Sequence, residues 1–310
     1  MQNSNAKVEE VDVDVEQDVE VESEEKKKLD EIPGRITDEK TPIVILFGPP
    51  SSGKTMILLR LIRYFQSKGN IVAPDYTFRS GDDEKYAEYC DNLLTIANDK
   101  YAAKQTAGLE FMLVKILDRA TPKYQILEAP GEHFFNDKFP TSSFPRYLNN
   151  IMTGNKNKRI WVFVLEVVWE GHKERDYRNY ARKIEGMARR INPNDTVVFL
   201  FDKVDQFQYG KKYEIKEAGL AYTNKPNIDA FTKRINVLYD NVITNFEKIR
   251  FPNRLFRYEC QKVCFSAGSF VPVKGSTDEQ GNEVPLEEWD VKPSDDVYCE
   301  ELLRAIRRAR

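Results

Sequence analysis

The sequence predicts an α/β fold built on a mostly parallel, six-stranded sheet with one antiparallel edge strand and helices on both faces. Short apolar runs alternate with segments of helical periodicity, which is typical of a parallel sheet covered by helices. Two of the runs are separated only by Asp118–Lys123, whose Thr-Pro pair favours a turn, so they predict a hairpin that supplies the antiparallel edge. An apolar fraction of 41% in 310 residues permits a substantial core.

The strands are expected where apolar residues run almost without interruption, as in a strand buried on both faces. In chain order they are Ile43–Phe47, Leu109–Leu117, Tyr124–Leu127, Ile160–Val168, Thr196–Phe201 and Leu255–Ser266. The helices are expected where apolar residues recur at helical spacing. In chain order they are Met56–Phe65, Glu84–Ile96, Tyr177–Ile191, Ile228–Ile249 and Asp296–Arg308.

Charge is distributed unevenly along the chain. Residues 1–31 carry 12 acidic side chains and 4 lysines, a net charge of -8, and the whole chain has -3, so the remainder has +5. This charge density predicts an acidic, disordered tail over residues 1–38, followed by one domain over 39–310 with a helical insertion at about 75–104. The acidity argues against nucleic acid as a partner of the tail and leaves open a role in tuning a partner protein.

The chain lacks the sequence features of membrane insertion, secretion and disulfide or zinc sites. Its longest apolar run, Ile160–Trp169, is interrupted by Glu166 and is shorter than the roughly 20 residues that span a bilayer. The amino terminus is polar and acidic, whereas a secretory signal is basic and then apolar. The 4 cysteines are irregularly spaced, which predicts reduced, buried thiols. We therefore expect a cytoplasmic protein.

A glycine-rich loop lies between the first expected strand and the first expected helix. The segment Gly48–Thr55 fits the pattern GxxxxGK[ST], and its place predicts a P-loop, the P-loop NTPase fold and a purine nucleoside triphosphate as ligand. Glycines let backbone N–H groups and the positive end of the helix face the phosphates. Lys54 is expected to neutralise the β and γ oxygens, and Thr55 to bind Mg²⁺. The residues expected to contact the nucleotide here are Gly48, Ser51, Ser52, Gly53, Lys54 and Thr55.

Three further polar segments follow later expected strands. They are Leu127–Glu132 (Leu-Glu-Ala-Pro-Gly-Glu), Phe201–Asp205 (Phe-Asp-Lys-Val-Asp) and Ser266–Gly268 (Ser-Ala-Gly). Each by itself is also typical of an ordinary turn, a solvated loop or a loop end. Their order after the P-loop resembles that of the P-loop GTPases of the Ras-like and translation-factor-like (TRAFAC) type, with their DxxG, NKxD and SAK elements. The resemblance spans roughly residues 41–310.

The resemblance implies further contacts to Mg²⁺ and the γ-phosphate. Glu128 takes the place of the family's aspartate and would hold Mg²⁺ through water, while the N–H of Gly131 would approach the γ-phosphate. The family also has a threonine that senses both, just before the first strand of the hairpin. Thr106 has that place, and Thr77, on a loop nearer the first helix, is a second candidate. Either threonine is also compatible with a capping role.

The resemblance also implies how the base is read. The aliphatic stem of Lys203 would cover the flat face of the base. The carboxylate of Asp205 would accept two hydrogen bonds, from the N1–H and the amino group of guanine, which adenine cannot donate. Ser266 and Ala267 would present backbone N–H groups to the guanine O6. GTP and GDP are therefore the expected ligands, with Mg²⁺ as the expected cofactor.

The residues expected to support hydrolysis are Lys54, Glu132 and His133. In the family a glutamine or a histidine follows the DxxG glycine and orients the attacking water, whereas here Glu132 has that place. A carboxylate beside the γ-phosphate repels it, so we expect slow turnover or dependence on an activating protein. His133 could take over the role, and it is equally compatible with a loop histidine. Phe134–Met152 is expected to move when the γ-phosphate is lost, so that an effector protein could sense the change.

Two other functions are compatible with these residues. An ATP-using P-loop enzyme would bind adenine elsewhere and leave Asp205 without a base partner. A nucleotide-binding interaction module would keep the P-loop without hydrolysing its ligand, and Glu128 and Glu132 favour that alternative. A preference for GTP over ATP would separate a GTPase from the ATP-using enzyme. Turnover in the presence of partner proteins would separate a GTPase from the interaction module.

Overall fold

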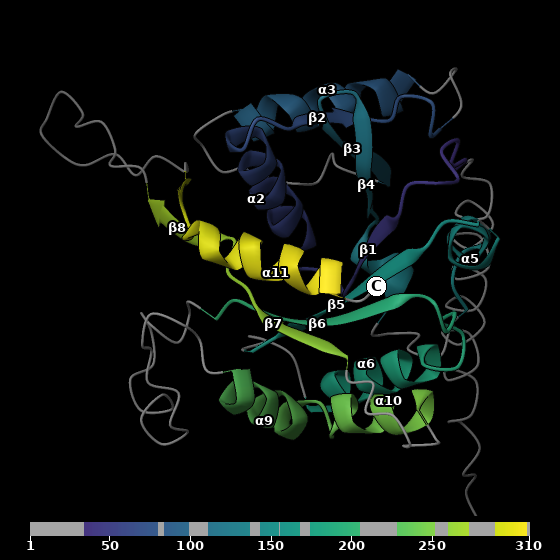
Figure 1. The fold of residues 1–310 in the computed structure, drawn as a ribbon. Coiled ribbons are helices and arrows are strands. Elements are labelled where there is room, and N and C mark those ends of the chain that lie inside the picture. Colours follow the sequence, from purple (N-terminus) through teal and green to yellow (C-terminus); the bar gives the residue numbers. More distant parts are fainter. Residues whose placement is uncertain are drawn as a thin grey trace, which may run out of the picture.

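The computed structural model describes residues 34–79, 84–98, 111–136, 143–154, 156–167, 174–204, 228–251, 260–272 and 289–308. Within these residues the main sheet has seven strands in the order β2-β3-β4-β1-β5-β6-β7 (Figure 1). The strands are β1 (Ile43–Phe47), β2 (Ile71–Pro74), β3 (Met112–Asp118), β4 (Thr121–Glu128), β5 (Arg159–Glu166), β6 (Thr196–Asp202) and β7 (Gln261–Cys264). A separate two-stranded antiparallel ribbon consists of β8 (Gly268–Pro272) and β9 (Trp289–Pro293).

The sheet is mostly parallel, which confirms the predicted fold class. Strand β1 pairs in parallel with β4 and β5, and the pairs β5–β6 and β6–β7 are also parallel. Strand β3 is antiparallel to both β4 and β2. The prediction of six strands with an antiparallel edge is therefore corrected to seven, with β3 reversed and β2 outside it. β2 has 4 residues and its Ile71 is exposed, so it lacks the long apolar run by which the other strands were predicted.

Helices cover both faces of the sheet. On one face lie α2 (Lys54–Ser67) and α11 (Asp296–Arg308), and on the other lie α6 (Glu174–Met187), α9 (Ile228–Leu238) and α10 (Val242–Arg250) (Figure 1). The helix α3 (Glu84–Asn98) packs against α2 and β2, where the sequence predicted a helical insertion. Two short helices, α4 (Gly131–Phe134) and α5 (Arg146–Thr153), follow β4. In the described part of the chain, no helix has both the length and the hydropathy needed to span a bilayer.

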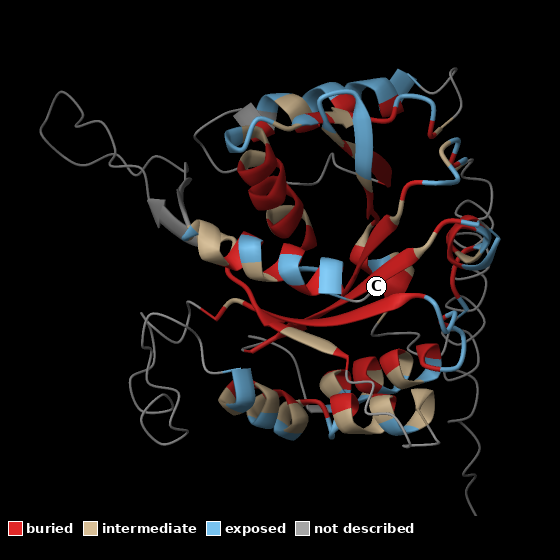
Figure 2. Cartoon of the chain, in the orientation of Figure 1, coloured by how far each residue is buried: buried red, intermediate tan, exposed pale blue. Residues whose placement is uncertain are grey.

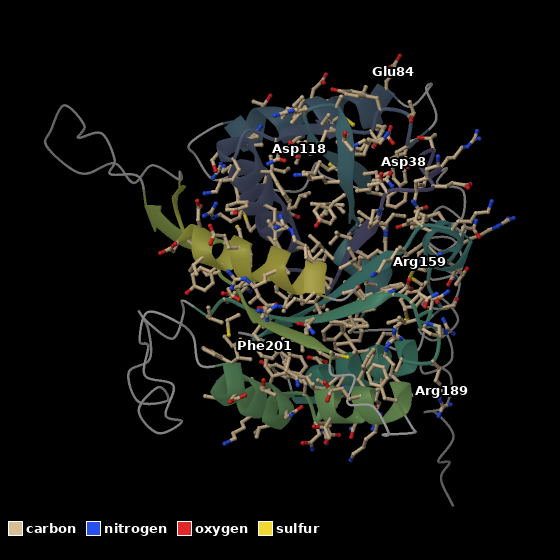
Figure 3. The ribbon with its side chains drawn as sticks, viewed as in Figure 1. Asp38, Glu84, Asp118, Arg159, Arg189 and Phe201 are labelled. Carbon is tan, nitrogen blue, oxygen red and sulfur yellow. The ribbon has the colours of Figure 1, made fainter. Side chains whose placement is uncertain are left out.

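The core is formed by the central strands and the apolar faces of the helices. Every residue of β1, β5 and β6 is buried (Figure 2), as expected for parallel strands covered on both faces. Figure 3 shows the side chains that fill the space between the sheet and the helices, with Phe201 of β6 labelled. The four cysteines are free and buried, which confirms the prediction for them.

One expected helix is broken in two. The apolar periodicity over Ile228–Ile249 predicts a single helix, but α9 ends at Leu238 and α10 begins at Val242. Asp240 and Asn241, between them, have φ values of 50° and 61°, a left-handed conformation that Asp and Asn tolerate better than most residues. The break also places the hydroxyl of Tyr239 where it donates to the backbone oxygen of Glu166, at 3.1 Å.

The amino-terminal part of the described chain packs against the sheet. The N–H of Arg35 donates to the backbone oxygen of Phe78 at 2.7 Å, and Ile36 is buried. The carboxylate of Asp38 accepts a hydrogen bond from the hydroxyl of Thr41 at 2.6 Å. Arg35, Ile36 and Asp38 belong to the last part of the tail predicted over 1–38. Residues 1–33, which carry its acidic charge, lie outside the described residues.

Candidate nucleotide-binding site

The P-loop connects the end of β1 to the start of α2, as the sequence predicts. Ser51 and Gly53 have left-handed φ values of 60° and 80°, which turn the chain back toward the first turn of the helix. A Cβ on Gly53 would lie 2.7 Å from Oδ2 of Asp202, and one on Gly48 would lie 2.5 Å from Oγ of Ser52. Both glycines therefore allow close approach, and the loop leaves the positive end of α2 facing the site.

Lys54 lies folded back across the loop. Its Nζ donates to the backbone oxygen of Pro49 at 2.8 Å, and the residue is buried. Burial lowers the pKa of Lys54, while the negative charges of Glu128, Glu132 and Glu166 act in the opposite direction. A buried cation surrounded by carboxylates and a glycine-rich backbone is suited to an anionic ligand, because phosphate oxygens would replace the carbonyl as its partner.

Thr55, in the first turn of α2, meets Glu128 at the end of β4. The hydroxyl of Thr55 donates to Oε1 of Glu128 at 2.8 Å, and Glu128 ends β4, which pairs with β1. The other carboxylate oxygen, Oε2, is buried and has no hydrogen-bond partner among the described residues. A hydroxyl and a carboxylate are the hard oxygen donors that Mg²⁺ prefers, so this pair fits the predicted metal position.

Gly131 lies directly against the P-loop. A Cβ at this position would be 2.2 Å from the backbone nitrogen of Pro50 and 2.4 Å from the carbonyl carbon of Pro49. No side chain fits between the two backbones. The structure thus brings the segment after β4 into contact with the P-loop, while the expected approach of the Gly131 N–H to a γ-phosphate stays a prediction.

The two catalytic candidates after Gly131 have different surroundings. Glu132 is exposed in the first turn of α4. His133 is partly buried, and its Nδ1 is hydrogen-bonded to the hydroxyl of Tyr147 from α5. Burial lowers the pKa of His133 to about 4, with Glu132 opposing the shift, so the imidazole is neutral at pH 7. A neutral imidazole can accept a proton, but here its Nδ1 is already occupied by Tyr147.

Lys203 follows β6 and reaches back to the P-loop. Its Nζ donates to the backbone oxygen of Ser51 at 3.3 Å and forms an ion pair with Glu166 at the end of β5. The nearby Ser266 is buried, and its Oγ accepts the N–H of Gly268 at 3.2 Å. The N–H of Val204 donates to the backbone oxygen of Phe265 at 3.3 Å, so the segments after β6 and β7 lie side by side.

Two expected ligand residues cannot be placed. Asp205 and Thr106 lie outside the described residues, so their roles stay predictions. The alternative threonine, Thr77, uses its hydroxyl and its N–H for hydrogen bonds to Oδ1 of Asp75, at 2.6 and 3.0 Å. Ala267 is described and follows Ser266 directly.

Three residues of the site were not predicted as such from the sequence. Glu166 pairs with Lys203, Asp202 lies beside Gly53, and Tyr147 bonds to His133. Glu166 left a usable signal, because a lone carboxylate in an apolar strand must find a partner when it is buried. Asp202 has the first place of the segment that resembles NKxD, although no contact was predicted for it, and the contact of Tyr147 depends on how the loops pack and left no signal.

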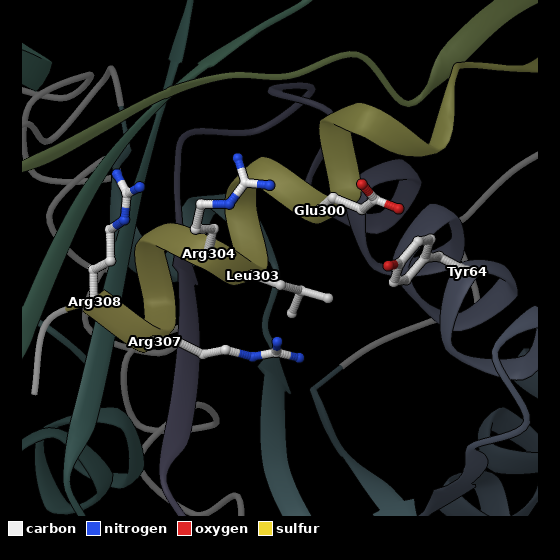
Figure 4. Close-up of a pocket in the computed structure, with 6 residues that line it drawn as sticks. All are labelled: Tyr64, Glu300, Leu303, Arg304, Arg307 and Arg308. Carbon is white, nitrogen blue, oxygen red and sulfur yellow. The ribbon is translucent and has the colours of Figure 1, made fainter.

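A hollow elsewhere on the surface contains none of these residues. Tyr64 of α2 and the exposed side of α11 line it (Figure 4). Its lining residues are Tyr64, Glu300, Leu303, Arg304, Arg307 and Arg308. Since the P-loop and its neighbours do not contribute to it, we do not include it in the nucleotide site.

Comparison with known proteins identifies distant structural likenesses. No protein-family model and no curated protein matches the sequence. Similar solved structures include nucleolar GTP-binding protein 1 of Plasmodium falciparum, with 12% identity and a TM-score of 0.40 over 89% of this chain and 93% of that chain. Another is Toc33 of Arabidopsis thaliana in complex with GDP and Mg²⁺, with 11% identity and a TM-score of 0.39 over 95% and 90%. At these TM-scores the fold assignment rests on the sheet order and the P-loop.

The stability of the nucleotide-free chain is expected to depend on pH through Glu128. Burial raises the pKa of its carboxyl from 4.5 to about 7, although Lys54 and Thr55 oppose the shift. Between these values the folded chain binds a proton that the unfolded chain has lost, so the contribution of Glu128 to stability falls as pH rises. Glu128→Gln should therefore become more stable relative to the wild type between pH 5 and pH 8, by at least about 1 kcal/mol.

Urea unfolding of both proteins across this pH range measures the difference. The burial of His133 lowers its pKa from 6.5 to about 4, which makes stability fall as pH decreases. That effect is present in both proteins and cancels in their difference. A difference that stays constant from pH 5 to pH 8 would contradict the assignment of a raised pKa to Glu128.

Proposed function

We propose that this chain binds GTP and GDP with Mg²⁺ and acts as a GTP-dependent switch or slow GTPase. The observation that carries the proposal is the hydrogen bond from Thr55, at the start of α2, to Glu128, at the end of β4, directly beside a P-loop whose lysine is buried. It joins the motif that binds phosphates to the carboxylate expected to hold the metal. An isolated glycine-rich turn would not require this arrangement.

Different residues of the site are proposed to contact the phosphates, the metal ion and the γ-phosphate. Backbone N–H groups of the P-loop and the amino terminus of α2 face the phosphates, and Lys54 neutralises their charge. Thr55 and Glu128 would hold Mg²⁺, which when bound would offset the negative charge of the phosphates. Gly131 lies against Pro50 of the P-loop, and its N–H is proposed to detect the γ-phosphate.

The base is proposed to lie beside the loops after β6 and β7. Lys203 extends across the P-loop toward Ser51, so its aliphatic stem is available to cover one face of a purine. Asp205 is proposed to accept the two guanine hydrogen bonds, and the backbone of Ser266 and Ala267 to meet O6.

Hydrolysis is proposed to be slow without a partner. Glu132 brings a negative charge near the γ-phosphate, and the Nδ1 of the neutral His133 is engaged by Tyr147. An activating protein that supplies an arginine could compensate, since such a residue raises rates by about 10³ to 10⁵. We propose a protein effector or activator as the partner on this basis.

A competition titration tests the nucleotide preference. GTP, GDP and ATP compete with a fluorescent guanine nucleotide for the full-length chain in the presence of Mg²⁺. We expect GTP and GDP to bind at least about 100-fold more tightly than ATP, because a carboxylate paired with guanine is left unpaired by adenine. Asp205→Ala should remove most of this preference. Equal or tighter binding of ATP by the wild type would favour an ATP-using enzyme instead.

A further inference from the structure

A buried carboxylate holds the base-side lysine in place. Glu166 is the last residue of β5 and is opposite Asp202, the last residue of β6, in the parallel pair. Lys203 follows immediately, and its Nζ forms an ion pair with Oε2 of Glu166. The same Nζ donates to the backbone oxygen of Ser51 at 3.3 Å. One ammonium group therefore connects β5, β6 and the P-loop.

The surroundings of the pair make its geometry specific. The side chain of Glu166 is 2% exposed and that of Lys203 is 29% exposed, so the carboxylate is the deeper member. Two hydrogen bonds hold the backbone here: the hydroxyl of Tyr239 donates to the backbone oxygen of Glu166 at 3.1 Å, and the N–H of the next residue, Val167, donates to the backbone oxygen of Asp202 at 3.2 Å. A carboxylate buried this deeply is costly without a cation, so Lys203 is drawn to a defined position.

The backbone of Lys203 supports the same conclusion. Its φ is 59°, a left-handed conformation that is uncommon for a residue with a long side chain. Such strain persists only where the surrounding contacts fix it. The ion pair with Glu166 and the hydrogen bond to Ser51 are two such contacts.

We propose that Glu166 is a positioning residue for nucleotide binding, which holds Lys203 across the P-loop so that its stem covers the base. This inference rests on the proposed function, because it assigns Lys203 to the guanine side of that site. It predicts that nucleotide affinity depends on the negative charge of the Glu166 carboxylate and not only on the volume of its side chain. It also predicts similar effects on GTP and GDP, because the proposed role of the pair is to position Lys203 at the base, which both nucleotides share.

The first experiment needs no nucleotide. Nucleotide-free protein is labelled with a brief pulse of an amine-acetylating reagent, and the reactivity of each lysine is read by mass spectrometry. We expect Lys203 to react several-fold faster in Glu166→Gln than in the wild type. Glu301→Gln is the matched control, because it removes a carboxylate that pairs with Arg304 on the exposed side of α11. Unchanged reactivity of Lys203 in Glu166→Gln would overturn the proposal.

The second experiment measures affinity in a double-mutant cycle. Glu166→Gln and Lys203→Ala should each weaken GDP and GTP by about tenfold, and the double variant no more than either alone. Thermal unfolding of each variant verifies that it is folded. Additive losses, or wild-type affinity in Glu166→Gln, would overturn the positioning role while the wild-type titration still supports guanine binding. Absence of guanine binding in the wild type itself would instead remove the proposed function.

Discussion

Lys54→Ala is expected to abolish nucleotide binding, with the dissociation constants for GTP and GDP raised by roughly 100-fold or more. The ammonium of Lys54 lies within the P-loop, bonded to Pro49 at 2.8 Å, where a phosphate oxygen would replace that carbonyl. Without it the phosphates would meet Glu128 and Glu132 with no compensating lysine. The displacement titration with a fluorescent guanine nucleotide measures the effect.

The control for this variant is Lys156→Ala. The side chain of Lys156 is 87% exposed, and its Nζ lies 3.7 Å from Oε2 of Glu39, away from the P-loop. Its loss should therefore leave the affinity for GTP and GDP unchanged. The fold should also survive in Lys54→Ala, because burial already disfavours the charge at this position. Lost binding with a normal unfolding temperature is the expected combination. Affinity within a few-fold of the wild type would refute the phosphate site.

Much of the fold could be predicted because the parallel strands and the helices left simple patterns. The run Ile43–Phe47 matches β1, and α11 has the predicted bounds Asp296–Arg308. A strand covered on both faces needs apolar residues throughout, and a helix on the sheet needs them along one face, so burial explains most of the residue types in these elements. The P-loop was predictable for a similar reason, because its glycines are required locally.

The fold predictions failed where a pattern was short or continued through a break. β2 is an edge strand whose apolar run, Ile71–Pro74, has only 4 residues and includes the exposed Ile71, so it is too short to mark a strand. The helical periodicity continues from α9 into α10 although Asp240 and Asn241 interrupt the backbone. The adjacent Asp and Asn were the available signal for that break.

The contacts within the site could be predicted only in part. Both Thr55 and Glu128 were assigned to Mg²⁺ from the sequence, but the hydrogen bond between them depends on β4 lying beside β1, whose end leads into the P-loop and α2. The ion pair between Glu166 and Lys203 links residues 37 positions apart and requires the β5–β6 register, which no local pattern contains. Ion pairs between residues on different strands follow from the order and register of the strands, so they can be placed only once the sheet is known.

Gly131→Ala is expected to displace the P-loop from the segment that follows β4. The added Cβ would lie 2.2 Å from the nitrogen of Pro50 and 2.4 Å from the carbonyl carbon of Pro49. Because both are backbone atoms, no side-chain rotation can relieve the overlap, and the P-loop or α4 must shift. We expect a loss of about 1–3 kcal/mol in the free energy of unfolding, together with weaker binding of GTP.

Gly186→Ala provides the matched control, since a Cβ there meets nothing within 4 Å. Gly186 lies inside α6, so alanine should leave stability unchanged or raise it by up to about 1 kcal/mol. Urea unfolding and the displacement titration compare the two variants directly. Similar results for both would mean that the close approach of Gly131 to the P-loop has no energetic importance.

Gly131→Ala also tests whether the segment Phe134–Met152 moves when the γ-phosphate is lost. If the N–H of Gly131 transmits the presence of the γ-phosphate, hydrogen exchange in Phe134–Met152 should differ between GDP and a non-hydrolysable GTP analogue in the wild type. In Gly131→Ala this difference should shrink, even at nucleotide concentrations that saturate the site, because the shifted backbone no longer reaches the γ-phosphate. Equal exchange with both nucleotides in the wild type would exclude Phe134–Met152 as the moving segment. A difference that Gly131→Ala leaves intact would assign the sensing to a residue other than Gly131.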